Sequence, residues 1–490
     1  MSKKYGFIGN TSIYMISSIF SFAISILVLP IYTRYLSPGD FGIIVLFMMF
    51  GTLLAGLLSG NLHFAAYRYY FEYKDDVEKF RILNSTNMFF LLVIFSLSAV
   101  IIYFSSSWLS SSLFSGQMSP NMILLSFISG CLSYLYLYMT TLLTAQVRAI
   151  PFTLMTILHI VLNTIFSLFF IFQYSLTYMA RINAILLSQG VLVLCLFVIT
   201  KHMFISRISI DSLKISLKLT LPMIPHQLIG IIQGSFDKTM LNKYTGSASV
   251  GFYSFGERFS LILKTIMDSV GKVWNVFFME KAHENTKESK KAIVTRFYEL
   301  VVIFMIIGLC LIYFSEEMIK ILTTKEFYPS MYVIPVYVYY YLVAIVGTLS
   351  MNQISYSKKM IYILPASIIS VIINVFLNII FIPRFGAVGA AGATSVAALF
   401  QQIILSYYAM KLFPLPIGKM RLFRLYSIVI GLTIFVYPIM IIEINIIIKI
   451  IIKLFLIFSF ILISIKYEYI SHSRITKLLS GIKQQIFYKK

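Results

Sequence analysis

The chain has little of what builds a soluble fold. Only 12% of its 490 residues are charged, whereas about 25% are charged in a typical soluble domain. Acidic residues are especially few, with 18 against 40 basic ones. The hydrophobic share is 59% and the mean hydropathy is +0.88. These values exclude a soluble globular enzyme and a disordered chain, and they leave a membrane protein that crosses the bilayer several times.

Cysteines and catalytic motifs are also scarce. Cys131, Cys195 and Cys310 lie in apolar stretches without metal-ligand spacing. The six histidines form no His-Glu-x-x-His pair, and the chain has no phosphate-binding lysine loop and no Gly-x-Ser-x-Gly turn. We therefore expect no catalytic residue, no metal and no cofactor, and we do not interpret the chain as an enzyme.

Long apolar stretches are what the sequence has instead. An apolar stretch of about 18 or more residues predicts a spanning helix, because only a helix satisfies its own backbone in hydrocarbon. We predict an all-α integral membrane protein with fourteen such helices. They cover residues 10–31, 41–62, 86–104, 121–143, 151–172, 180–199, 217–236, 250–271, 296–314, 331–351, 361–382, 388–410, 425–442 and 446–465.

The basic residues predict the orientation of these helices. The net charge of +22 is spread over short loops, not over one basic face, so we expect no nucleic-acid partner. The loops after odd-numbered helices hold only seven of the 40 basic residues: Arg34, Arg181, Lys238, Lys243, Lys320, Lys325 and Arg384. The positive-inside rule therefore places both chain ends in the cytoplasm, with the basic tail on anionic membrane lipids. The longest loops, around Lys74 and from His283 to Lys291, are too short for a catalytic domain.

The sequence contains an internal repeat. Residues 150–166 match residues 364–381 at an offset of 214–215, and residues 33–42 match residues 242–251 at an offset of 209. Because each copy has an even number of helices, both copies have the same orientation in the membrane. The predicted parts are a six-helix lobe at 1–200, a cytoplasmic linker at 201–216, a second six-helix lobe at 217–412, two extra helices within 413–466, and a basic cytoplasmic tail at 467–490.

The predicted helix at 250–271 carries unusual charge. It holds Glu257, Arg258, Lys264 and Asp268, and three of them, Glu257, Lys264 and Asp268, share one face. Four ionisable groups on one span are costly in lipid, so this face meets either a water-filled cavity or partner helices. A purely structural ion-pair ladder is the alternative. Arg258 has no obvious partner once Lys264 pairs with Asp268, which favours a substrate-binding cavity.

Other charged positions are weaker candidates for the binding site. Arg68 follows the second helix, where it lies at the mouth of a cavity or simply anchors the loop to the membrane. Asp237 ends the predicted helix at 217–236, either in the site or as an interfacial pair with Lys238. Lys449 and Lys453 are expected to extend outward to the membrane surface.

Three motifs resemble those of a known superfamily. The turn Leu36–Gly42 resembles the Leu-x-Pro-x-x-Phe/Tyr-Gly turn of polysaccharide exporters in the multidrug/oligosaccharidyl-lipid/polysaccharide (MOP) superfamily. The segments 221–225, 237–238 and 250–254 resemble the opening of their second lobe. Residues 378–391 resemble the turn between their helices 11 and 12, although the first-lobe counterpart, 174–181, lacks proline and glycine.

The resemblance implies MATE-like lobes and the function of a Wzx-type flippase. Such proteins move polyprenyl-diphosphate-linked oligosaccharide units of O-antigen, lipopolysaccharide or capsule type across the bacterial inner membrane by alternating access. The implied partners are that lipid-linked oligosaccharide and, further on, a polysaccharide polymerase and chain-length machinery. The implied binding cations are Arg258, Lys264 and Arg68. A multidrug or cation antiporter of the same superfamily is one alternative, and a membrane polysaccharide polymerase is a weaker one.

Overall fold

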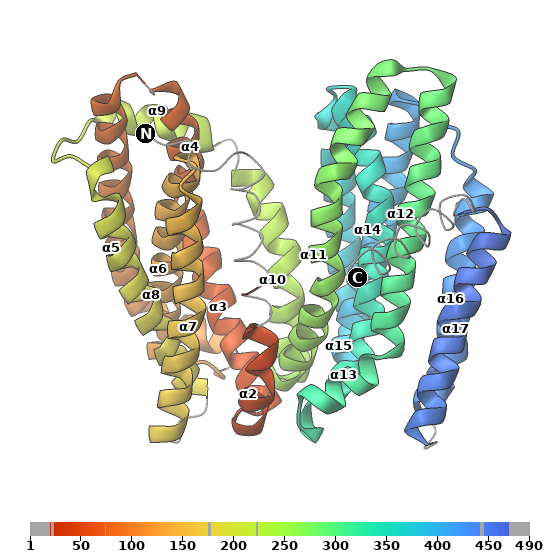
Figure 1. Cartoon of the computed structure of the whole chain (residues 1–490). Helices are drawn as coiled ribbons and strands as arrows, with labels where there is room; N and C mark the ends of the chain where they lie inside the picture. The colour runs from red at the N-terminus through yellow and green to blue at the C-terminus, as the bar shows by residue number, and fades with distance from the viewer. Residues whose placement is uncertain are drawn as a thin grey trace, which may run out of the picture. The chain divides into compact units, whose positions relative to one another are not determined.

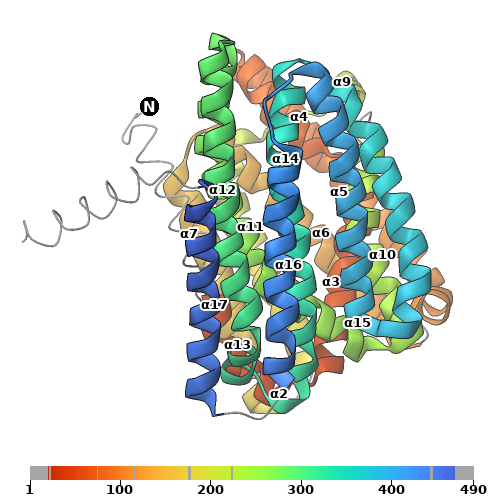
Figure 2. The ribbon, with the colours of Figure 1, turned by 90° about the vertical axis from the view of Figure 1, so that its right-hand side faces the viewer.

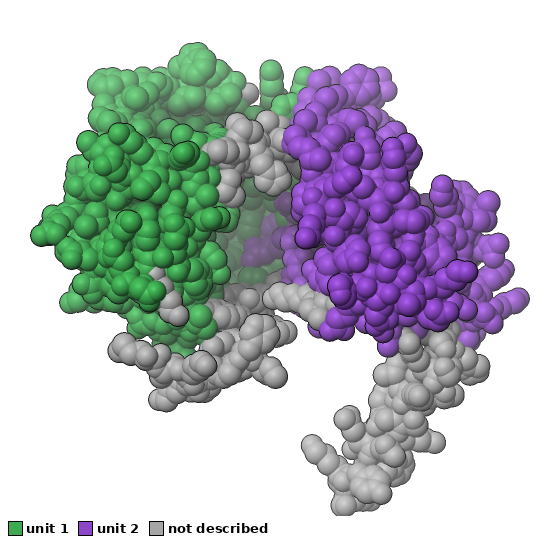
Figure 3. All heavy atoms as spheres, turned by 90° about the horizontal axis from the view of Figure 1, so that it is seen from above, with its two compact units in different colours: residues 1–254, 322–327 green, residues 255–321, 328–490 purple. Residues whose placement is uncertain are grey.

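The computed structural model describes residues 20, 24–73, 75–114, 116–174, 178–221, 224–441 and 445–469. Within this part of the chain the regular structure consists of helices, as Figure 1 shows. Two compact units are present (Figure 3). Unit 1 comprises residues 1–254 and 322–327, and unit 2 comprises residues 255–321 and 328–490. The chain passes from unit 1 to unit 2 inside one long helix.

Unit 1 is a bundle of antiparallel helices. Helix α6 lies at its centre and packs against α3, α5 and α8, while α7 packs mainly on α8. The helices are α2 (Leu29–Tyr35), α3 (Pro38–Leu58), α4 (Leu62–Glu72), α5 (Val77–Phe114), α6 (Pro120–Ala145), α7 (Ala149–Tyr174), α8 (Tyr178–Thr200), α9 (Ile210–Thr220) and α10 (Ile224–Thr245). Helices α4 and α9 lie side by side at one end of the bundle (Figure 1).

Unit 2 begins within α11 (Ser247–Glu284). The remaining helices are α12 (Lys287–Tyr313), α13 (Ser315–Leu322), α14 (Val333–Tyr356), α15 (Ile363–Leu412), α16 (Lys419–Ile441) and α17 (Ile446–Lys466). Short 3₁₀ turns cover Lys201–Met203, Lys325–Tyr332 and Met360–Tyr362. Helices α12, α16 and α17 pack against one another, and α14 packs against α12 and α15 (Figure 2).

Length and composition make nine of the described helical segments able to cross a membrane. Their surfaces are apolar, as at Ile101 and Phe104 of α5, which are 65% and 80% exposed. Such exposure suits hydrocarbon, not water. Of the fourteen predicted spans, 10–31 lies mostly outside the described residues. The predicted spans 361–382 and 388–410 correspond to two helices that share the label α15 and are divided by non-helical backbone at Gly386, where φ is 54°.

The loop predicted from His283 to Lys291 is largely helical, so that prediction is wrong. The segment 283–291 contains only the turn at Asn285 and Thr286, where Thr286 caps α12 by accepting a hydrogen bond from the Ser289 amide. The expected linker 201–216 contains residues 210–216 of α9, which is more than half of that 11-residue helix. Charged residues such as lysine and glutamate are good helix formers, so a helix can continue beyond its apolar stretch and hydropathy alone underestimates its length. Pro222 lies between α9 and α10, outside the described residues.

A close crossing of two helix starts reflects the internal repeat. Gly42 occupies the same place in α3 as Gly251 does in α11. A Cβ atom on Gly42 would lie 1.7 Å from the carbonyl oxygen of Ser247, and one on Gly251 would lie 2.1 Å from that of Pro38. These two contacts are related by the same offset of 209 positions that relates the sequence segments. The crossing therefore has the local two-fold character that a repeat of equal orientation produces.

Candidate functional site: a polar face on α11

The middle of α11 exposes an ion pair. The ammonium of Lys264 lies 2.6 Å from the carboxylate of Asp268, one turn further along the helix, and the side chains are 49% and 62% exposed. Thr265 and Ser269, on the same stretch, are also exposed and donate hydrogen bonds to backbone carbonyls one turn back. This face of α11 is therefore polar and uncovered by neighbouring helices.

The cost of charge in hydrocarbon decides what this face contacts. A charged side chain at the centre of a spanning helix costs about 2.5–3.5 kcal/mol in insertion measurements. Helix α11 has 38 residues, its pair lies midway along it, and it is not among the nine described segments apolar enough to cross a membrane. Contact of this pair with lipid tails would be strongly unfavourable. Water or a polar ligand is the environment that suits Lys264 and Asp268.

Glu257 and Arg258 do not join this pair. Glu257 is half-buried, and its carboxylate accepts a hydrogen bond of 3.4 Å from the hydroxyl of Tyr337 on α14. Arg258 is half-buried and interacts with a neighbouring group, so the expectation that it lacks a partner is wrong. The charged residues predicted on this helix therefore have different environments. Lys264 and Asp268 are exposed, whereas Glu257 faces α14 within unit 2.

An amide pair extends the polar face and was missed in the sequence. Asn275 is exposed on α11, and its side-chain oxygen accepts a hydrogen bond of 3.0 Å from the amide of Asn352 on α14. Asn352 itself is only 7% exposed. The helical spacing from Lys264 and Asp268 to Asn275 could have indicated this residue, because these positions fall on nearby faces.

The other two predicted site residues lie in unit 1. Arg68 of α4 is exposed and lies 3.9 Å from Glu72, one turn further along, which is a surface arrangement. Near it, His63 contacts the hydroxyl of Tyr134, and burial lowers the pKa of His63 to about 4, so the ring is neutral at physiological pH. Asp237 is 1% exposed and accepts a hydrogen bond of 2.7 Å from the Tyr253 hydroxyl. Arg68 and Asp237 thus belong to unit 1, whereas Lys264 and Asp268 belong to unit 2.

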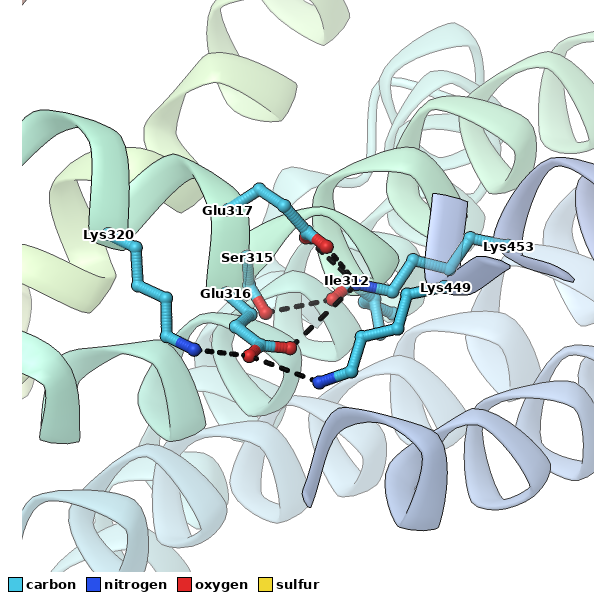
Figure 4. Close-up of polar contacts among 7 residues, drawn as sticks. All are labelled: Ile312, Ser315, Glu316, Glu317, Lys320, Lys449 and Lys453. Atoms are coloured by element: carbon cyan, nitrogen blue, oxygen red, sulfur yellow. Dashed lines mark hydrogen bonds and ion pairs between the residues drawn. The ribbon is translucent and has the colours of Figure 1, made fainter. Parts of the chain in front are cut away.

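Lys449 and Lys453 correct a further prediction, because both are buried. Lys453 is fully buried and lies 2.6 Å from the carboxylate of Glu317, while Lys449 lies 3.4 Å from that of Glu316. Lys320 completes the group at 2.6 Å from Glu316 (Figure 4). The lysines cannot extend to the membrane surface because α13 places two carboxylates against α17. The sequence did contain a sign of this ion cluster. Glu316 and Glu317 lie four and three positions before Lys320, the spacing at which charged side chains pair along a helix.

This ion cluster predicts a pH dependence of stability. Burial raises the pKa of the Glu316 carboxyl, but the hydrogen bond from Lys320 and the charges of the three lysines outweigh it and hold that pKa below its ordinary 4.5. A lowered folded-state pKa contributes stability above the unfolded pKa and loses it as pH falls through the folded pKa. We expect Glu316→Gln to lose about 1–3 kcal/mol relative to the natural protein at pH 7.

The measurement is the apparent melting temperature of both proteins in detergent between pH 7 and pH 3. The advantage of the natural protein should shrink below about pH 4.5, because the unfolded carboxyl titrates there. An advantage that stays constant over the whole range would contradict the ionic origin of the stabilisation.

No group of three or more histidine, cysteine, aspartate or glutamate side chains in the described part of the chain could hold a metal ion. A separate hollow of about 460 Å³ lies where α11 meets α12 and is lined by Phe277, Glu288, Lys291, Ala292, Thr295 and Arg296. It does not include the Lys264–Asp268 pair.

Comparison with known proteins shows which family the sequence matches and which solved structures are similar to this fold. Residues 31–332 match the model of a family described as polysaccharide biosynthesis protein. No curated protein matches the sequence. Among solved structures, the lipid II flippase MurJ in an inward closed conformation is similar, with a TM-score of 0.72 and 18% identity over 93% of this chain and 98% of that one.

Two further structures have the same fold. An inward-facing multidrug resistance MATE transporter of the MOP superfamily has a TM-score of 0.64 and 14% identity, covering 82% of this chain and 97% of that one. A MOP superfamily transporter from Pyrococcus furiosus has a TM-score of 0.54 and 15% identity, covering 82% and 95%. With more than half of its length matched, the chain belongs to the polysaccharide biosynthesis protein family, and its fold is similar to that of these MOP superfamily transporters.

Proposed function

We propose that this protein is a flippase for polyprenyl-diphosphate-linked oligosaccharide units of O-antigen or capsule type. It moves them from the cytoplasmic to the outer leaflet of a bacterial inner membrane by alternating access. The observation that carries the proposal is the exposed Lys264–Asp268 pair midway along α11. An ammonium in a partly desolvated setting binds a diphosphate far more strongly than one in bulk water does, and adjacent hydroxyl and amide groups suit sugar hydroxyls.

The family and the fold support a lipid-linked substrate. The matched family is one of polysaccharide biosynthesis, and the similar MurJ structure is described as a lipid II flippase. Family and structural neighbours are transporters and flippases, which agrees with the expectation that the chain is not an enzyme. The fourteen-helix count, the two six-helix lobes, the inner-membrane location and the cytoplasmic chain ends belong to this proposal, as do a polymerase and chain-length machinery as partners.

A cation-coupled multidrug exporter is the second candidate, and one observation favours it. Asp237 is a buried carboxylate paired with a tyrosine hydroxyl, the kind of group that holds a proton or a cation inside a membrane. The same residue also suits a flippase driven by an ion gradient, so it does not weigh against the first proposal. The polymerase alternative has no described feature in its favour.

Deletion of the gene tests the proposal. We expect surface polysaccharide to disappear while lipid-linked single repeat units accumulate on the cytoplasmic leaflet, because synthesis continues without translocation. The units are quantified after membrane fractionation, with sidedness read from their accessibility to an impermeant glycosidase. Units that appear on the outer leaflet unpolymerised would identify a polymerase, and unchanged surface polysaccharide with raised drug sensitivity would identify a multidrug exporter. Re-expression of the natural gene is the control.

A further inference from the structure

Arg181 lies inside unit 1 and is not a loop residue. The sequence places it among the seven basic residues of the outer loops, but the structure places it in the first turn of α8, half-buried beside α2 and α7. Its guanidinium carbon lies 4.4 Å from the centre of the Tyr32 ring. A cation held inside a helical membrane bundle is costly and needs a reason.

The contacts of Arg181 are all with neutral groups. Its Nη1 donates to the Tyr32 hydroxyl, to the Asn163 side-chain oxygen and to the Ser167 hydroxyl, each at 2.8 Å. No salt bridge to Arg181 occurs in the described residues. Hydroxyl and amide dipoles orient a guanidinium but do not neutralise it. A full positive charge therefore remains among these four side chains, which we call the Arg181 nest: Arg181, Tyr32, Asn163 and Ser167.

The opposite edge of the same guanidinium makes no hydrogen bond. Nε is buried without an acceptor, and Nη2 has no acceptor among the described residues. Nε and Nη2 together form the edge with which an arginine grips two oxygens of one phosphate or carboxylate. Nη1 is saturated because three acceptors surround its two hydrogens. The nest therefore fixes the guanidinium on one side and leaves its bidentate edge, whose Nε is buried, without an acceptor among the described residues.

We propose that Arg181 is a phosphate-binding residue of unit 1, which contacts the diphosphate of the lipid-linked substrate through Nε and Nη2. This rests on the proposed function, because the ligand is the diphosphate of the substrate proposed there. Tyr32, Asn163 and Ser167 act as positioning residues, because they hold the guanidinium through Nη1. The same chemistry would accept an ordinary phospholipid headgroup, so the test separates the two sources.

The experiment measures binding of undecaprenyl diphosphate to the purified full chain by native mass spectrometry in detergent. We expect Arg181→Gln to weaken binding by about tenfold or more, as the loss of a charged hydrogen-bonded pair does. Arg181→Lys should be intermediate, because the charge stays but the fork is lost. Arg34→Gln is the matched control: Arg34 is an exposed arginine of α2, in the same helix as Tyr32.

A second variant keeps the proposal testable if Arg181→Gln does not fold. Asn163→Asp places a carboxylate next to Nη1 with no change in size, so it neutralises Arg181 while preserving the packing. A merely structural arginine would tolerate or gain from this ion pair. An anion-binding arginine should lose affinity for undecaprenyl diphosphate by about tenfold at an unchanged melting temperature.

Three results would overturn the inference. Equal binding by the natural protein and by Arg181→Gln, or by Asn163→Asp, would make Arg181 structural. Phosphatidylglycerol competing as well as undecaprenyl diphosphate would make the nest a general headgroup site. Failure of the natural protein to bind undecaprenyl diphosphate at all would instead remove the proposed function, so the two failures are distinguishable.

Discussion

Replacing Gly42 by alanine should remove most of the folded protein from the membrane. The added Cβ would lie 1.7 Å from the Ser247 carbonyl oxygen and 2.5 Å from its carbon, both of them backbone atoms that no side-chain rotation can move. The start of α11 would have to shift by more than an ångström. Overpacking of well-packed cores costs about 1–3 kcal/mol and sometimes more, and a backbone contact lies at the upper end.

The two-fold relation makes this prediction sharper. Gly251→Ala should have a similar effect, because its Cβ would lie 2.1 Å from the Pro38 carbonyl oxygen in the corresponding contact. Gly190→Ala is the control, since a Cβ there meets nothing within 4 Å and alanine favours a helix. The measurements are the yield of monodisperse protein and its apparent melting temperature. A natural melting temperature for Gly42→Ala would show that the crossing is looser than described.

Replacing Lys264 by alanine should abolish translocation at an unchanged protein level. An exposed ion pair contributes about 0–1 kcal/mol to stability, so the loss of Lys264 should leave the fold intact. A cation that contacts a diphosphate in a low-dielectric cavity contributes far more to binding, and we expect at least a tenfold loss of flipping. Complementation of a flippase-deficient strain, with the protein level measured in parallel, checks this.

The double change Lys264→Ala with Asp268→Ala separates the two roles of the pair. A structural ladder predicts recovery, because removing both partners is milder than leaving one unpaired. A substrate cation predicts continued loss of transport. Lys281→Ala is the matched control, since Lys281 forms a comparable ion pair with Glu284 at the end of α11. Near-natural complementation by the double variant would overturn the assignment of Lys264 as a substrate cation.

The exposure of Lys264 and Asp268 favours one of the two interpretations of the charges on α11, a substrate-binding face, over the other, a structural ion-pair ladder. From the sequence alone, a ladder that fixes helix packing and a cavity-lining face were both open. A ladder buried between helices would show covered side chains, as Lys453 and Glu317 do elsewhere in unit 2. Lys264 and Asp268 are open instead, so packing gains little from them. The two ion pairs therefore illustrate opposite uses of charge within one membrane protein.

The sequence by itself determined the membrane class, the repeat and the family resemblance. Apolar stretches of bilayer length allow only helices, and the paired segments 33–42 and 242–251 indicate two related copies before any contact is known. It also indicated that Lys264 and Asp268 lie one turn apart on α11, because spacing along a helix is set by its 100° rotation per residue. These properties depend on local order along the chain.

Only the tertiary structure decided which charges are covered. Lys453 and Lys264 both lie within predicted apolar spans, yet one is fully buried against Glu317 and the other is 49% exposed. Arg181 sits in a neutral nest built from three helices, although the sequence assigns it to a loop. Partners that are far apart in the chain set the environment of each charge, and the spacing of residues within one helix carries no information about them.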